Sequence, residues 1–102
     1  MSYEPKLRRN AREKITAYLD EHYSTRETYL RAVEEIRLAL LKLAANPRQA
    51  FAPPGLFEHR PIYRFVLNAD GVKRRVQVCF FYDQDDPGER TIVITDFLPL
   101  SL

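Results

Sequence analysis

The chain has a single cysteine and three glycines among its 102 residues. One cysteine, Cys79, excludes an internal disulfide framework and a cysteine-rich zinc site. The shortage of glycine argues against the glycine-rich loops that hold phosphates. No apolar run approaches the roughly 20 residues of a membrane-spanning helix, and residues 1–9 carry no apolar signal core. We therefore expect a cytoplasmic protein without a membrane association.

The composition is that of an ordinary folded domain. Apolar residues make up 45% of the chain and charged residues 29%, which argues against a disordered chain. The length favours one domain over residues 1–102 with one modest core. The formal net charge of +2 is too small to indicate a partner by itself, so the distribution of charge along the chain is more informative.

Charge is sorted into two basic segments and one acidic segment. The N-terminal basic segment contains Lys6, Arg8, Arg9, Arg12 and Lys14. Residues 60–75 contain further cations and a single carboxylate, Asp70. The charged side chains of residues 83–89 are all carboxylates. Such a molecule can attract phosphate locally while staying close to neutral overall. A solvated surface is the simpler alternative, and composition does not separate the two interpretations.

Two helices are predicted, over residues 10–22 and 25–45. Each begins with a capping pattern, in which Asn10 precedes Glu13 and Ser24 precedes Glu27 by three positions. Apolar residues then recur at helical spacing: Ala11, Ile15, Tyr18 and Leu19 in the first helix, and Tyr29, Val33, Ile36, Leu40 and Leu43 in the second. The second helix ends before Pro47, because the residue preceding a proline avoids the α region. The short link between them predicts a helical hairpin whose apolar stripes face one core.

After a proline-rich loop at residues 46–61, the composition becomes typical of strands. Three strands are predicted over residues 62–68, 72–82 and 91–98, which are rich in Val, Ile, Phe, Tyr and Thr. Asp70-Gly71 predicts a tight turn between the first two strands, and residues 85–88 turn the chain before the third. The expected fold class is therefore α+β, with a helical hairpin packed on an antiparallel sheet.

The Asp70-Gly71 turn also predicts the pairing of the first hairpin. With these two residues as the loop, Ala69 pairs with Val72 and Asn68 with Lys73. The pairing continues away from the turn, one residue at a time on each strand, as far as Tyr63 with Val78. Alternation then places one set of side chains toward the helices: Tyr63, Phe65, Leu67, Val76, Val78 and Phe80, with Arg74 near the turn. Combined with the helix stripes, this face predicts a core that contains Val33, Ile36, Leu40, Phe65, Val76 and Val78.

The opposite face of the hairpin carries cations and amides without a carboxylate. Its residues are Arg64, Val66, Asn68, Lys73, Arg75 and Gln77. Three cations on one open sheet surface are suited to contacts with phosphate or nucleic acid. The alternative is the solvated side of an antiparallel sheet, which is polar by default. The candidate RNA-binding residues are Arg64, Lys73, Arg75 and Gln77.

No other combination of residues indicates a chemical site. His22 and His59 have no metal-ligand spacing to each other or to Cys79, so no metal is expected. Cys79 lies among aromatic residues of a predicted strand, and we interpret it as a small packed side chain. The carboxylates of residues 83–86 lack the length and terminal glutamate of an EF-hand loop, so we interpret them as a solvated turn. No cofactor is expected.

Several stretches together match a known pattern of two helices followed by a meander. The second helix ends in Leu40-Leu41-Lys42-Leu43-Ala44-Ala45-Asn46-Pro47. The Asp-Gly turn is flanked by Ile62-Tyr63-Arg64-Phe65-Val66-Leu67 and Arg74-Arg75-Val76-Gln77-Val78. Phe80-Phe81-Tyr82 and Ile92-Val93-Ile94-Thr95-Asp96-Phe97 follow. In order and composition the chain resembles the RelE/ParE superfamily of bacterial toxin–antitoxin modules, nearest its HigB/RelE branch.

The resemblance implies both a fold and a function. The fold adds a short N-terminal strand, which residues 2–7 could supply, and so gives a sheet of three or four strands. The function implied is that of a toxin that binds mRNA at the ribosome through Arg64, Lys73 and Arg75 and acts as an mRNA interferase. An antitoxin protein would hold it in check by laying an apolar helix or strand into the groove between helices and sheet.

The chain departs from the family's pattern at its C-terminal end. RNase members place Lys, Arg, His or Tyr just after the last strand, whereas residues 97–102 contain none of these. RNA cleavage needs cations beside the phosphate and groups that accept and donate protons, so no catalytic residue is assigned. The alternative is a non-catalytic protein-binding module of the same fold, either of the gyrase-inhibitor type or a degenerate orphan.

Overall fold

The computed structural model describes residues 3–47, 61–82 and 91–100. Its elements in chain order are β1 (Glu4–Leu7), α1 (Arg9–His22), α2 (Arg26–Ala45), β2 (Ile62–Leu67), β3 (Arg74–Tyr82) and β4 (Thr91–Pro99). The turn predicted at residues 85–88, most of the loop at residues 46–61, His59 and the carboxylates of residues 83–86 lie outside the described residues. Within the described ranges, neither helix has the length and apolar character needed to cross a bilayer.

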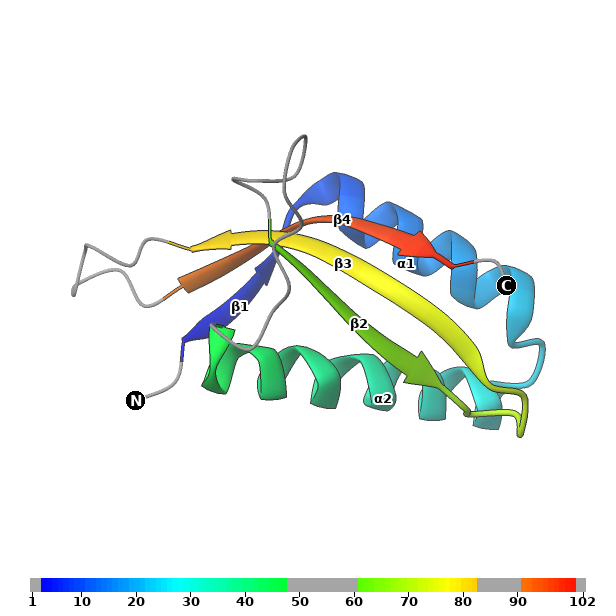
Figure 1. The fold of residues 1–102 in the computed structure, drawn as a ribbon. Coiled ribbons are helices and arrows are strands. Elements are labelled where there is room, and N and C mark those ends of the chain that lie inside the picture. Colours follow the sequence, from blue (N-terminus) through cyan, green and yellow to red (C-terminus); the bar gives the residue numbers. More distant parts are fainter. Residues whose placement is uncertain (1–2, 48–60, 83–90, 101–102) are drawn as a thin grey trace.

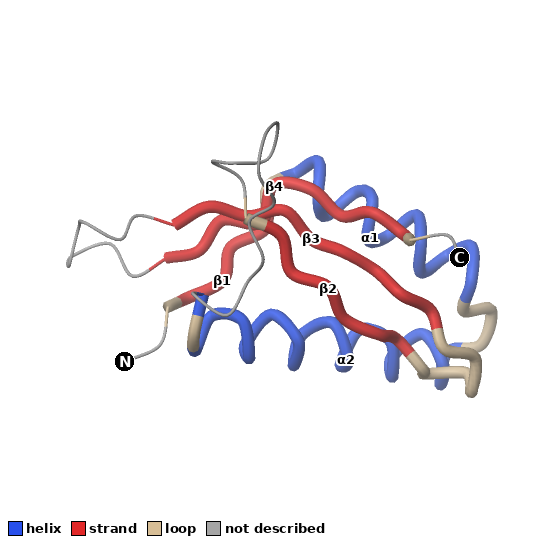
Figure 2. The backbone as a smooth tube through the Cα atoms, in the orientation of Figure 1, coloured by secondary structure: helices blue, strands red, loops and turns tan. Residues whose placement is uncertain are grey.

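The four strands form one sheet in the order β1-β4-β3-β2 (Figure 1). The strands β2, β3 and β4 make the predicted antiparallel meander. The N-terminal strand is present as β1, but it pairs with β4 in parallel, so the sheet is mixed. Both helices cover the same face of the sheet and run in opposite directions (Figure 2). The α+β class is therefore confirmed, and we call the sheet face away from the helices the open face.

One hydrophobic core lies between the helices and the sheet. Its largest fully buried side chains are Phe80, Phe97, Leu43, Leu67, Ile92, Ile94, Val76 and Val78. Of the predicted core residues, Ile36, Leu40, Val76 and Val78 are confirmed as buried, and Phe65 is partly buried against the cluster. The apolar spacing along both helices and the alternation along the strands therefore meet in a single core.

The prediction that Val33 is buried is wrong, because this residue is 40% exposed. The reason is the way in which the two helices sit on the sheet. α1 packs on β4, whereas α2 packs on β1 and β2. The helices therefore leave a space between them, and Val33 lines that space rather than the core.

The register of the β2–β3 hairpin is the predicted one along both strands. Tyr63 pairs with Val78 and Leu67 with Arg74, and every pair between them follows in order. The two faces sort as expected, because Leu67, Val76, Val78 and Phe80 are buried while Arg64, Val66 and Arg75 are exposed. The two pairs predicted beside the turn, Asn68 with Lys73 and Ala69 with Val72, are not part of the ladder.

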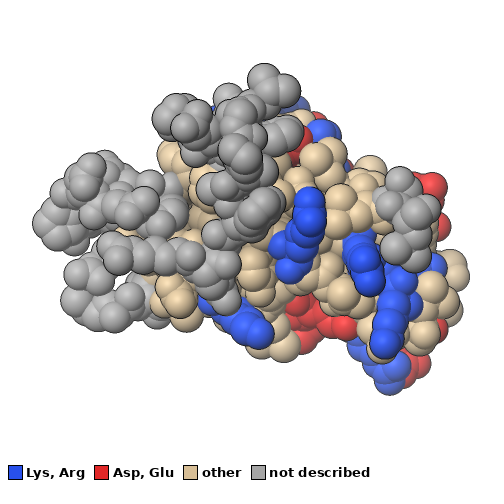
Figure 3. All heavy atoms as spheres, in the orientation of Figure 1, with Lys and Arg blue, Asp and Glu red and all other residues tan. Residues whose placement is uncertain are grey.

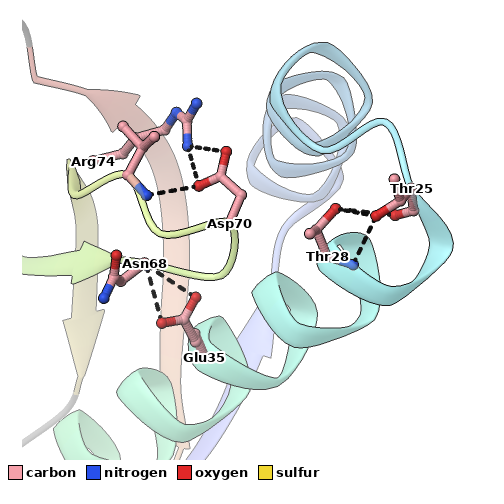
Figure 4. Close-up of polar contacts among 7 residues, drawn as sticks. Thr25, Thr28, Glu35, Asn68, Asp70 and Arg74 are labelled. Atoms are coloured by element: carbon pink, nitrogen blue, oxygen red, sulfur yellow. Dashed lines mark hydrogen bonds and ion pairs between the residues drawn. The ribbon is translucent and has the colours of Figure 1, made fainter.

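Side-chain carboxylates explain why the ladder stops early. Both carboxylate oxygens of Glu35 on α2 accept the backbone N–H of Asn68, at 3.0 and 3.1 Å. Asp70 accepts the backbone N–H of Val72 at 3.1 Å (Figure 4). These N–H groups are satisfied without a cross-strand partner. Gly71 has a φ of +86°, in the left-handed region that glycine adopts without strain.

The cap predicted for the first helix is wrong. α1 begins at Arg9, so Arg8 occupies the cap position, where its side chain makes no capping hydrogen bond. The backbone N–H of Arg8 donates to the carbonyl of Ile94 at 3.0 Å. This bond ties the residue between β1 and α1 to β4. Asn10 lies inside the helix, and its amide instead donates to the carbonyl of Thr95 at 3.1 Å.

The second helix has a cap one residue later than predicted. Thr25, rather than Ser24, accepts the backbone N–H of Thr28, at 3.2 Å (Figure 4). The hydroxyl of Thr28 donates to the carbonyl of Thr25 at 3.2 Å, which differs from a capping box, where the third side chain accepts the backbone N–H of the cap residue. Glu27 instead accepts a hydrogen bond from Arg31 at 2.6 Å.

Candidate nucleic-acid interface

The predicted RNA-binding residues lie together on the open face of β2 and β3. Arg64 of β2 is the cross-strand partner of Gln77 on β3. Arg75 lies two residues before Gln77, and Lys73 immediately precedes the strand. Arg64, Lys73 and Arg75 are all exposed. Figure 3 shows Lys and Arg atoms at several places on this side of the molecule.

Gln77 lies on the open face but does not present its amide to solvent. The residue is only 8% exposed, because it lies between Arg64 on β2 and Leu98 on β4. Its Oε1 accepts a hydrogen bond from Nε of Arg64 at 3.1 Å. Gln77 therefore positions the guanidinium of Arg64 and offers little surface for a ligand of its own.

Lys73 and Arg75 make no ion pair with any residue that the structure describes. Arg74 between them differs, because its Nη1 donates to both carboxylate oxygens of Asp70, at 2.7 and 2.8 Å. This hydrogen bond holds the pKa of Asp70 below its usual value. The guanidinium of Arg74 also lies over the ring of Tyr23, 5.3 Å from its centroid. Arg74 thus stabilises the turn, while its two neighbours keep free positive charges.

The free cations border a hollow at the end of the sheet, which we call the basic pocket. It has a volume of about 490 Å³, within the range of small-ligand sites. The last turn of α1, the start of β3 and the end of β4 meet there (Figure 1). Its lining residues are Tyr18, His22, Lys73, Arg74, Arg75, Pro99 and Leu100. The backbone N–H of Leu100 donates to the carbonyl of Arg75 at 2.9 Å, which holds the residue after β4 beside the pocket.

His22 is the residue of this pocket that sequence reasoning missed. It ends α1, and its side chain is 32% exposed. The imidazole lies 4.4 Å from the ring of Tyr18, centroid to centroid. Tyr18 in turn packs edge-on against Phe97 of β4 at 5.4 Å, and burial raises the pKa of its hydroxyl. The packed aromatic rings therefore fix the imidazole on the wall of the pocket.

The other end of the open face carries an aromatic ring and a cation. The guanidinium of Arg8 lies over the ring of Phe81, 5.0 Å from its centroid. Phe81 is an exposed residue of β3 and is the cross-strand partner of Val93. The N-terminal basic segment therefore reaches the open face through Arg8.

A second surface lies on the helix side and is apolar. The space between the helices forms a groove of about 440 Å³, which we call the apolar groove. Its lining residues from β1, α1 and α2 are Pro5, Leu7, Ile15, Leu19, Val33, Ile36, Arg37, Leu40 and Leu41. Leu41, like Val33, is about two-fifths exposed. Exposed apolar side chains around a groove are typical of a surface that binds another protein.

Comparison with known proteins adds no functional information, because no protein-family model, curated protein or solved structure gives a significant match. In the part of the chain that the structure describes, no three His, Cys, Asp or Glu side chains are grouped so that they could hold a metal ion. Cys79 is buried, as predicted. The functional argument therefore depends on the free cations, the imidazole and the apolar groove.

Proposed function

We propose that the protein binds single-stranded RNA with the open face of β2 and β3, as the toxin-like component of a bacterial toxin–antitoxin module. The observation that carries the proposal is the pair Lys73 and Arg75, both exposed and both without a carboxylate partner among the described residues. Proteins hold single strands with positively charged surfaces that follow the phosphate backbone. The resemblance to the RelE/ParE superfamily supports mRNA at the ribosome as the target and mRNA interferase as the activity.

RNA binding of this kind depends on salt. Each cation that contacts a phosphate of a single strand releases condensed counterions, which gives a slope of log affinity against log salt of about −0.7 per contact. Contacts by Arg64, Lys73 and Arg75 together predict a slope of about −2. A sheet surface that is only solvated predicts no such slope.

Fluorescence anisotropy with labelled single-stranded RNA, measured over a series of salt concentrations, tests this proposal. Replacing Arg64 and Arg75 with alanine should weaken binding and reduce the slope to about −0.7. The matched control replaces Arg9 and Arg31, which pair with glutamates on their own helices. It removes the same charge, yet its slope should stay near that of the parent. A sheet variant that binds RNA as well as the parent would remove the basis of the proposal.

The apolar groove supports a protein partner. We assign an apolar helix or strand of an antitoxin to this groove, because Val33 and Leu41 leave apolar surface exposed along it. The same observation favours a second candidate function, a non-catalytic protein-binding module of the gyrase-inhibitor type or a degenerate orphan.

Induced expression in bacteria, with growth and mRNA integrity followed together, separates these functions. Growth arrest with mRNA cleavage supports the interferase, because cleaved mRNA cannot be translated. Growth arrest with intact mRNA supports the gyrase-inhibitor type. Normal growth would identify a degenerate orphan.

A further inference from the structure

β2 lies at one edge of the sheet, and its outer side is open (Figure 1). The backbone N–H of Phe80 donates to the carbonyl of Pro61 at 3.2 Å. In an antiparallel pair, residues that exchange backbone hydrogen bonds alternate with residues whose backbone groups face away. The pairing register then directs the N–H and C=O groups of Ile62, Arg64 and Val66 away from β3. No residue that the structure describes pairs with these outward backbone groups.

The opposite edge of the sheet is protected against pairing with another strand. β1 has only four residues, and Pro5 within it has no backbone N–H to donate. The backbone N–H of Tyr3, just before the strand, donates to the carbonyl of Ala44 on α2 at 2.8 Å. Short edge strands, prolines and lysines such as Lys6 are features by which proteins prevent pairing between edges. β2 has six residues and contains neither proline nor lysine, so it lacks these features.

We infer that β2 is the interface between two copies of this chain, whose β2 strands pair in antiparallel orientation about a two-fold axis. Strand addition of this kind satisfies the backbone groups that an edge strand leaves unpaired. It joins two four-stranded sheets into one continuous sheet and places the two open faces side by side. The pairing itself does not depend on the proposed RNA binding.

The carboxylate of Glu35 selects the register of this pairing. The backbone N–H of Asn68 also faces away from β3, but both carboxylate oxygens of Glu35 accept it. The outward groups left on each strand all find partners when Arg64 of one copy lies opposite Arg64 of the other. Ile62 then lies opposite Val66 of the other copy, and each of these pairs exchanges two backbone hydrogen bonds. Among the described residues, any other register leaves some of these groups unpaired.

The side chains along this edge are self-complementary in the same register. On the helix side, Tyr63 lies opposite Phe65 of the other copy, and both side chains are partly exposed. Within one copy these two rings are stacked, with 5.8 Å between their centroids, so the pairing brings four rings together. On the open face, Val66 is 48% exposed and gains Ile62 of the other copy as a neighbour. Aromatic and β-branched pairs across strands stabilise a sheet.

Among the side chains of β2, only that of Arg64 opposes the pairing, because it lies opposite the same residue of the other copy and like charges repel. Its Nε donates to Oε1 of Gln77 on β3 at 3.1 Å. This hydrogen bond draws the guanidinium over its own sheet and away from the edge. Salt screens the repulsion that remains. Self-association should therefore not weaken as salt is raised, whereas RNA binding should weaken.

Analytical ultracentrifugation of the full chain over a series of concentrations tests the inference. The parent should sediment as a dimer that dissociates on dilution. Val66→Lys should weaken self-association by roughly 10-fold to 10²-fold, because each dimer loses two buried valines and gains two charges at its edge. Val72→Lys is the matched control, since Val72 is 52% exposed and lies in the turn beyond the ladder. It should associate like the parent, and circular dichroism checks that both variants fold.

A cysteine placed on β2 tests the register. Arg64→Cys brings two thiols opposite each other, on Cα atoms about 5.5 Å apart in a hydrogen-bonded pair, which is within the span of a disulfide. The oxidised variant should therefore run as a covalent dimer. Asn68→Cys should stay monomeric under the same conditions, because Asn68 lies beyond the pairing. The parent should also stay uncrosslinked, because Cys79 is buried.

The outcomes separate this inference from the proposed function. A parent that sediments as a monomer at every concentration would leave the β2 edge to a strand of a different protein and would overturn the inference. Equal association of the Val66→Lys and Val72→Lys variants would overturn it as well. A monomer that binds RNA would leave the proposed function intact, whereas a dimer that does not bind RNA would remove the proposed function alone.

Discussion

Truncating Leu43 to alanine should destabilise the protein by about 3 to 5 kcal/mol. Leu43 lies on α2, is fully buried and belongs to the core cluster. The change removes three carbon atoms from the core, which accounts for about 2.4 kcal/mol of lost burial at about 0.8 kcal/mol each. The cavity left behind accounts for the rest. For a chain of 102 residues, a loss of about 3 kcal/mol lowers Tm by roughly 15 °C.

The matched control is Leu41→Ala, two positions earlier on the same helix, where the residue is 42% exposed in the apolar groove. Leu41→Ala should lower the free energy of unfolding by less than about 1 kcal/mol, because folding buries less apolar area at this position than at Leu43. Urea unfolding followed by circular dichroism measures both variants, and an unchanged m-value validates the comparison. Equal losses in the two variants, or a loss below about 1 kcal/mol for Leu43→Ala, would refute the assignment of core and groove faces on α2.

Thr25→Ala should cost about 0.5 to 2 kcal/mol, because its hydroxyl caps α2, whereas Ser24→Ala should leave stability nearly unchanged. Thermal unfolding of the two variants checks this, and the reverse order would restore the cap predicted from sequence. Asp70→Asn should remove part of the dependence of stability on pH. The hydrogen bond from Arg74 lowers the pKa of Asp70, so its stabilising effect is fully present above the ordinary pKa of an aspartate and is lost as the pH falls through the lowered value. Urea midpoints measured from about pH 5 to about pH 2 should therefore fall less in the variant than in the parent, and parallel curves would contradict the role given to Asp70.

The β2–β3 hairpin was predictable because its signals are local. The Asp-Gly turn and the alternation of side chains specify one register, since a slip of one residue would place Leu67 and Val76 in solvent. The helices were predictable for the same reason, from apolar spacing within each segment. These elements also place Arg64, Arg75 and Gln77 on the open face, so the position of these candidate residues followed from the sequence.

The remainder depends on how separate elements meet. Val33 has the spacing of a core residue, but it lines the groove between the two helices and is therefore exposed. Gln77 has the alternation of an exposed residue, but its place between two other strands covers it. His22 is far in sequence from Lys73 and Arg75, and only the folded chain brings all three residues to the lining of one pocket. The spacing of residues along the sequence does not predict these contacts, because they form between elements that are distant in the chain.

The most direct test of RNA binding is the salt dependence of RNA affinity in a protein that lacks both free cations of the basic pocket. Replacing Lys73 and Arg75 together removes two positive charges that no described carboxylate neutralises. If both contact phosphates, the slope of log affinity against log salt should lose about 1.4 of its magnitude, while the Arg9 and Arg31 control keeps the parent's slope. A slope equal to the parent's in the Lys73 and Arg75 variant would contradict the account.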